Sequence, residues 1–167
     1  MEDTMDRLKL HFRKNCEGYF LNAEGKILAR KSEKGFIIFP GGGIDDGENI
    51  WEGMIREVLE ETEFKVKING ELGKIQISWG ENWAKTEKQK KRYEIYQGDE
   101  MHFFFGEIVD SEIADIDEED KWDGEKFMDI QEVIDFIDST KPFEEDVKKY
   151  REVQIKFLNE LKDKLAI

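Results

Sequence analysis

The feature that most constrains the fold is a stretch of bare backbone, Pro40 followed by Gly41, Gly42 and Gly43. A strand candidate, Phe36–Phe39, ends at the proline, which has no N–H for a ladder hydrogen bond. Glycine has no Cβ, so the loop that follows can approach a metal ion or a phosphate closely. The sequence therefore predicts a strand and then a tight glycine loop with a ligand beside it.

A helix is predicted after this loop, beginning near Glu48. Its apolar residues recur at steps of three and four, which places them on one face. Three glutamates, Glu57, Glu60 and Glu61, fall within one arc on the opposite side. The apolar face, which we expect to pack on a sheet, comprises Trp51, Met54, Ile55, Val58 and Leu59.

The glutamate cluster is unfavourable by itself. Like charges three or four residues apart repel by roughly 0.2–0.5 kcal/mol per pair, and acids near a helix C-terminus oppose the helix dipole. A divalent cation removes both penalties, and oxygen ligands suit Mg²⁺ or Mn²⁺ better than zinc. The alternative is a solvated acidic face, because 40 residues are Asp or Glu. The glycine loop upstream favours the metal site.

The run from Gly42 to Phe64 resembles the Nudix box, the signature of the Nudix hydrolase family. Gly42 is followed after five residues by Glu48, and after seven more by Arg56-Glu57-Val58-Leu59-Glu60-Glu61. One position departs from the signature, since the family usually has glycine where this chain has Glu63. That glycine lies just past the helix, where left-handed backbone ends it.

The resemblance implies a site and a chemistry. It implies that Glu57, Glu60 and Glu61 hold magnesium (manganese is the alternative) against the substrate diphosphate. The Gly41 carbonyl would add a ligand. The resemblance also implies that Arg56 and Glu48 support and orient the cluster. Gly42 and Gly43 would lie beside the substrate. Glu125 would be the acid that activates water, with Glu118 and Glu119 as alternatives.

The order of the predicted elements, together with the resemblance, implies an α+β fold, a Nudix-type three-layer α/β/α sandwich with a mixed β-sheet. We expect one domain over 1–167, with a polar N-terminal arm at 1–14 and a C-terminal amphipathic helix at 142–167. The other predicted elements are strands at Cys16–Leu21, Lys26–Arg30, Ile68–Ile77, Tyr93–Tyr96 and Met101–Val109, the last two joined by a turn at Gln97–Asp99, and a short helix at Ile130–Ile137.

A basic, aromatic segment at 79–92 stands out in this acidic chain and is interpreted as a long hairpin excursion. Its Lys90, Lys91, Arg92 and Trp83 could grip additional phosphates and stack a nucleobase. A solvated hairpin tip is the equal alternative.

Charge and hydropathy limit the partners. The formal net charge of -14 argues against non-specific nucleic-acid binding, because like charges repel. No apolar stretch approaches the length of a membrane span, and the start has no signal-peptide core, so the cytoplasm is the expected location. The C-terminal helix could cover the sheet or a partner subunit, which leaves a homodimer open.

The sequence thus predicts a magnesium-dependent hydrolase that cleaves a phosphoanhydride bond in a nucleoside diphosphate linked to another moiety. A nucleoside triphosphate is favoured because the compact domain has no evident extra substrate domain. Sugar nucleotides, dinucleoside polyphosphates and capped RNA ends stay open. The alternatives to an enzyme are a non-catalytic nucleotide-sensing Nudix domain and a partner-binding module that uses the acidic surface.

Overall fold

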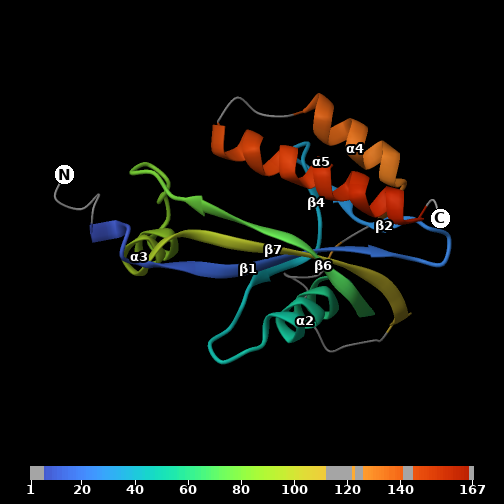
Figure 1. Cartoon of the computed structure of the whole chain (residues 1–167), viewed down its shortest axis with the longest axis horizontal. Coiled ribbons are helices and arrows are strands. Elements are labelled where there is room, and N and C mark those ends of the chain that lie inside the picture. Colours follow the sequence, from blue (N-terminus) through green and yellow to red (C-terminus); the bar gives the residue numbers. More distant parts are fainter. Residues whose placement is uncertain (1–5, 112–121, 123–125, 141–144, 166–167) are drawn as a thin grey trace.

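The computed structural model describes residues 6–111, 122, 126–140 and 145–165. Figure 1 shows a twisted sheet between helices. The strands are β1 (His11–Leu21), β2 (Ile27–Leu28), β3 (Arg30–Lys31), β4 (Ile37–Ile38), β5 (Gly41–Gly43), β6 (Phe64–Ser78), β7 (Tyr96–Ser111) and β8 (Phe127–Met128), and the helices are α2 (Ile50–Thr62), α3 (Glu87–Ile95), α4 (Ile130–Ser139) and α5 (Glu145–Leu165).

The main sheet is mixed. Its strand order is β6-β7-β1-β2-β8, and β5 pairs with β1 beside this path. The central pair, β1 and β7, is parallel, whereas β5, β2 and β6 pair antiparallel with their neighbours. The short strands β3 and β4 form a separate two-stranded sheet. The predicted mixed sheet is therefore confirmed.

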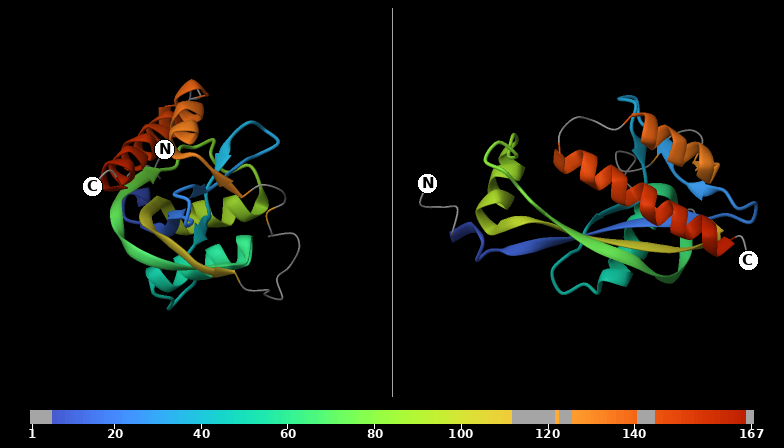
Figure 2. Two further views of the ribbon diagram at one scale, coloured as in Figure 1. Left: turned by 90° about the vertical axis from the view of Figure 1, so that its right-hand side faces the viewer. Right: turned by 45° about the horizontal axis from the view of Figure 1, so that its top comes forward.

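Side chains that alternate along the central strands divide the core into two layers. Tyr19 of β1 and Phe103 of β7 are buried against α4 and α5. Phe20 and Phe104, their neighbours in the sequence, are buried on the other face, against α2. Figures 1 and 2 show α2 on one side of the sheet and the α4–α5 pair on the other. This arrangement confirms the predicted three-layer sandwich.

The buried face of α2 is narrower than the apolar pattern predicted. Met54 and Val58 are fully buried, but Trp51 and Ile55 are 41% and 38% exposed. The sheet meets the helix along Met54 and Val58, flanked by the small residue Gly53, which is buried without contributing to an apolar pattern. Hydrophobic periodicity gives the direction of the buried face but not its width.

The predicted turn at Gln97–Asp99 is wrong, because β7 runs without a break from Tyr96 to Ser111. Gly98 marks a close approach of two strands instead: a Cβ on it would lie 2.0 Å from the carbonyl oxygen of Ile77. The residues before it, including Tyr93, belong to α3 and not to a strand. The excursion between β6 and β7 therefore contains a helix, which begins with a capping box at Thr86.

The two ends of the domain differ from expectation in detail. Strand β1 begins at His11, inside the expected polar arm. Helix α5 covers the sheet, with Phe157, Leu158 and Leu161 in the core. Pro142, predicted to open this helix, lies outside the described residues. No helix in the described part of the chain is long and apolar enough to cross a membrane.

Glu63 ends α2 in left-handed backbone, with φ at 67°, and its N–H donates to the Leu59 carbonyl. A side chain costs about 1 kcal/mol in this conformation and glycine does not. We expect Glu63→Gly to raise the free energy of unfolding by up to about 1 kcal/mol in urea denaturation. Turnover should stay unchanged.

Glu63→Ala is the matched control, because it removes the charge and keeps the left-handed strain. It should give no gain in stability. A large loss of turnover in a folded Glu63→Gly protein would show instead that this side chain contributes to the site.

Candidate active site

The predicted glycine loop forms the edge strand β5, and each glycine has a different reason to lack a side chain. A Cβ on Gly41 would lie 2.2 Å from the backbone oxygen of Cys16 on β1. A Cβ on Gly42 would lie 2.7 Å from the carboxyl group of Glu57. Gly41 thus permits the pairing of β5 with β1, and Gly42 makes room for an acidic side chain from α2.

Two of the helix glutamates meet at this edge strand. Glu61 accepts a hydrogen bond from the N–H of Gly41 at 3.3 Å. Its carboxyl group also hydrogen-bonds that of Glu57, which lies beneath Gly42. Burial, followed by the charge of Glu57, raises the pKa of Glu61 to about 9. Burial also raises the pKa of Glu57. Without a cation, the pair therefore retains a proton at neutral pH.

Arg56 donates hydrogen bonds from all three guanidinium nitrogens to the acidic residues of the site. Nε and Nη2 donate to the two carboxylate oxygens of Glu48, at 2.8 and 3.0 Å. Nη1 donates to Glu57 and Glu60, each at 3.1 Å. Nη2 also donates to the carbonyl of Gly43 at 3.1 Å. Arg56 therefore ties the start of α2, the acidic face and β5 together, and its hydrogen bonds hold the pKa of Glu48 below the ordinary value.

The donor set fits a hard divalent cation, since it consists of carboxylates beside bare backbone. Glu57, Glu60 and Glu61 are the side chains that could hold it, with the Gly41 carbonyl next to them. In the arrangement seen here, Glu57 and Glu60 are turned toward Arg56. No three acidic, histidine or cysteine side chains of the described residues already enclose an ion position.

The acidic loop before α4 reaches the site through one described residue. Glu118, Glu119 and Glu125, predicted as candidates for activating water, lie outside the described residues. Trp122, between them in the sequence, is buried, and its N–H donates to the Glu61 carbonyl at 2.8 Å.

The predicted substrate-binding residues of the basic segment are spread apart. Trp83 is stacked on Trp79, with the ring centroids 3.7 Å apart. Lys90 and Lys91 are exposed on α3, which lies at one end of the sheet (Figure 1). Arg92 is half-buried, and its charge acts on Arg13 of β1. Arg92 of α3 therefore lies near Arg13, a residue that the sequence analysis did not predict to belong to the site.

The missing side chain of Gly43 leaves room for the guanidinium group of Arg13. A Cβ on Gly43 would lie 2.0 Å from Arg13 Nη2, so the guanidinium rests against bare backbone. Arg13 Nη1 donates to Asn15, and Asn15 Nδ2 donates to Asp99 on β7. Only the parallel pairing of β1 with β7 joins these residues. No local sequence pattern could have found them.

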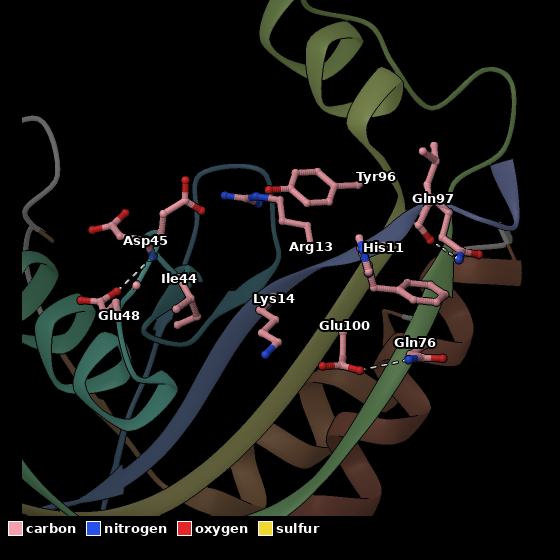
Figure 3. A pocket seen from close by; sticks show the side chains of 14 residues that line it. His11, Arg13, Lys14, Ile44, Asp45, Glu48, Gln76, Tyr96, Gln97 and Glu100 are labelled. Carbon is pink, nitrogen blue, oxygen red and sulfur yellow. Dashed lines mark hydrogen bonds between the residues drawn. The ribbon is translucent and has the colours of Figure 1, made fainter. Parts of the chain in front are cut away.

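A cavity of about 600 Å³ lies along β1, beside Glu48, and Arg13 is one of the residues that line it (Figure 3). Lys14, Glu100 and Ile44 also line this cavity. Figure 3 also shows the backbone N–H of Asp45 donating to Glu48, at 3.0 Å. Acids and bases are mixed along the lining of this cavity.

Comparison with known proteins decides the family. The NUDIX domain model matches residues 14–152. The chain belongs to the Nudix family. A curated relative, a putative 8-oxo-dGTP diphosphatase of Bacillus subtilis (strain 168), is 28% identical over 83 residues, which cover 50% of this chain. They cover 44% of the relative, so less than half of its length is matched.

Solved structures share the architecture of this Nudix domain. The MutT protein from Methanosarcina mazei Go1 has a TM-score of 0.54 at 18% identity, covering 92% of this chain and 98% of that one. A UDP-X diphosphatase has a TM-score of 0.53 at 18% identity, covering 97% and 70%. A NUDIX hydrolase from Nitrosomonas europaea has a TM-score of 0.52 at 18% identity, covering 79% and 82%. These likenesses concern the fold alone.

Proposed function

We propose that this Nudix domain is a magnesium-dependent hydrolase that cleaves a phosphoanhydride bond in a nucleoside diphosphate linked to another moiety. The observation that carries the proposal is the Glu57–Glu61 pair, whose two buried carboxyl groups are held side by side at the bare edge strand, so that the pKa of Glu61 is raised to about 9. Such a pair is costly unless a cation takes the place of the proton. Manganese, which also accepts oxygen ligands, is the alternative ion.

Each residue of the site then has a task. A bound divalent ion would neutralise the charge that develops on the phosphate oxygens and orient the diphosphate. Glu57, Glu60 and Glu61 would hold it, with the Gly41 carbonyl. Arg56, through its bidentate contact with Glu48, would orient the acidic face that holds the ion.

An acid of the loop around Trp122 would accept the proton of the attacking water. Trp122 bonds the Glu61 carbonyl, which supports a role for this loop in the site. Glu125 remains the first candidate, with Glu118 and Glu119 as rivals. These three assignments stay predictions from the sequence.

A nucleoside triphosphate is the favoured substrate. The relative named as a putative 8-oxo-dGTP diphosphatase supports this preference, and the neighbour named UDP-X diphosphatase keeps sugar nucleotides open. Gly42 and Gly43 would lie beside the diphosphate. Lys90, Lys91 and Arg92 would add positive charge, and Trp83 an aromatic face, at the end of the sheet. The cytoplasmic location and a homodimer also stay predictions.

The proposal is tested by a phosphate-release screen over nucleoside triphosphates, sugar nucleotides, dinucleoside polyphosphates and capped RNA. Turnover should require Mg²⁺ or Mn²⁺ and cease in EDTA. Binding of a nucleotide without metal-dependent turnover of any of them would favour the non-catalytic nucleotide sensor instead.

A further inference from the structure

Arg13 is a half-buried cation with no directly bonded carboxylate among the described residues. No carboxylate of that part of the chain lies within 4 Å of its guanidinium, and the one hydrogen bond it donates goes from Nη1 to Asn15 Oδ1, at 2.9 Å. Burial, followed by the nearby charge of Arg92, lowers the pKa of Arg13. The charges of Asp99 and Glu57 act in the opposite direction and raise this pKa, but neither carboxylate forms an ion pair with the guanidinium. A partly buried charge without a directly bonded counter-ion is costly. The position therefore calls for an anion supplied from outside the chain.

The guanidinium lies next to the proposed metal site. It rests against Gly43, whereas the carboxyl group of Glu57 rests against Gly42, the adjacent residue of β5. Successive residues of a strand point to opposite faces. Arg13 and Glu57 therefore flank the same edge strand, one above and one below, and the charge of Glu57 acts on Arg13. An anion held by the glutamate-bound ion can reach Arg13 around this thin, side-chain-free edge.

A chain of three residues holds Arg13 in place: Asn15 of the same strand, Asp99 of β7 and Trp79, which follows β6. Asn15 is 5% exposed, and its amide donates to Asp99 Oδ1 at 2.6 Å and to the Arg13 carbonyl at 3.1 Å. The other oxygen of Asp99 accepts the Trp79 indole N–H at 2.9 Å. Because both of its polar ends are fixed, Asn15 presents its oxygen to Arg13 in one orientation. A cation positioned in this way loses little freedom when it binds an anion.

We propose that Arg13 binds a phosphate oxygen of the substrate beside the metal-bound diphosphate, and that Asn15 is its positioning residue. This inference rests on the proposed function. The planar guanidinium matches phosphate with two parallel N–H donors, as an ammonium group does not. Arg92 adds a second positive charge to the same region. Together they favour a substrate with a chain of phosphates over one whose diphosphate continues into an uncharged sugar.

The test compares Arg13→Gln, Arg13→Lys and Lys14→Gln with the wild type. Lys14 is the matched control, since it is the next residue of β1 and its side chain points away from that of Arg13, toward Glu100 (Figure 3). Two quantities are measured: the Kd of inorganic pyrophosphate in Mg²⁺ by calorimetry, and KM and kcat for the best nucleotide of the screen. Arg13→Gln should raise Kd and KM by about 10- to 100-fold, with the larger change in KM than in kcat.

Arg13→Lys should recover only part of the affinity, and Lys14→Gln should match the wild type. Asn15→Ala should raise KM by itself, and adding it to Arg13→Gln should give no further increase, as expected of a residue that acts through Arg13. Guanidinium ion added to Arg13→Gly should lower KM and leave the wild type unchanged. The melting temperature of each variant separates loss of binding from loss of fold.

The inference and the proposed function fail in different ways. If no nucleotide is hydrolysed but pyrophosphate binding is weakened in Arg13→Gln, the proposed function fails and the anion site stands. If nucleotides are hydrolysed and Arg13→Gln matches the wild type in KM and Kd, the inference alone is wrong. It is also overturned if the wild type does not bind pyrophosphate, or if Lys14→Gln weakens binding as much as Arg13→Gln does.

Discussion

Glu61→Gln is expected to lower kcat by about 1,000-fold or more on every substrate that the wild type hydrolyses. Glu61 lies at the centre of the site, between the N–H of Gly41 and the carboxyl group of Glu57. An amide in its place supplies no negative charge to a cation. Losing several kcal/mol of metal-based charge stabilisation corresponds to at least a thousandfold in rate.

Glu52→Gln is the control for this experiment. It lies in the first turn of the same helix, is exposed, and removes the same charge from the chain. Its kcat should stay within about twofold of the wild type, since a single exposed charge at a distance is screened by salt. Initial rates of phosphate release at saturating Mg²⁺ make the comparison. Equal losses in both variants would mean that net charge, not the site, determines the rate.

The second large effect concerns stability without a metal ion, which is expected to fall as the pH rises from about 4.5 to about 9. The pKa of Glu61 is raised from 4.5 to about 9 in the folded protein. Between these values the folded state holds a proton that the unfolded state has released, so the free energy of unfolding decreases with pH. Above the higher value the penalty is complete, and below the lower value it is absent.

Magnesium should reverse this loss, because it binds the ionised pair of the folded state. At a concentration 100 times its Kd, a ligand of the folded state adds about 2.7 kcal/mol, which corresponds to several °C in melting temperature. The measurement is the melting temperature between pH 5 and 9, in EDTA and in Mg²⁺, for the wild type and Glu61→Gln.

The difference between these two proteins isolates the site. Burial also raises the pKa values of Glu17 and Asp99, and those two carboxyl groups are present in both proteins. Glu61→Gln in EDTA should melt at a higher temperature than the wild type at pH 8, and it should gain less from magnesium. Parallel curves for the two proteins would contradict the assignment of the proton to the Glu57–Glu61 pair.

The parts of the candidate site that lie on one helix and one adjacent strand could be predicted from the sequence. Glu57, Glu60 and Glu61 are neighbours by helical spacing alone, and the glycines stand next to them in the chain. Glu63 was predicted to occupy the position where the helix ends, and it does so in left-handed backbone. The layer order was implied by the order of the predicted elements together with the resemblance to the Nudix family.

What the sequence could not provide depends on contacts between distant strands. Arg13 and Asp99 meet only because β1 pairs in parallel with β7. Gly98 was taken for a turn residue, although it serves a close approach between β6 and β7. In the sequence, a glycine in a turn and a glycine at a close approach of two strands look the same. Only the register of the sheet distinguishes the two. The proposed role of Arg92 depends on its position near Arg13, and not on the lysines beside it in the sequence.

The central claim is that Glu57 and Glu61 retain a proton which a divalent cation displaces. Calorimetric titration of metal-free protein with Mg²⁺ at pH 7.5, in two buffers of different ionisation enthalpy, counts the protons released per ion bound. The expected result is a release of about one proton in the wild type and almost none in Glu61→Gln, which should also bind the ion more weakly. Failure of the wild type to bind Mg²⁺, or binding of equal strength without proton release in both proteins, would contradict the claim.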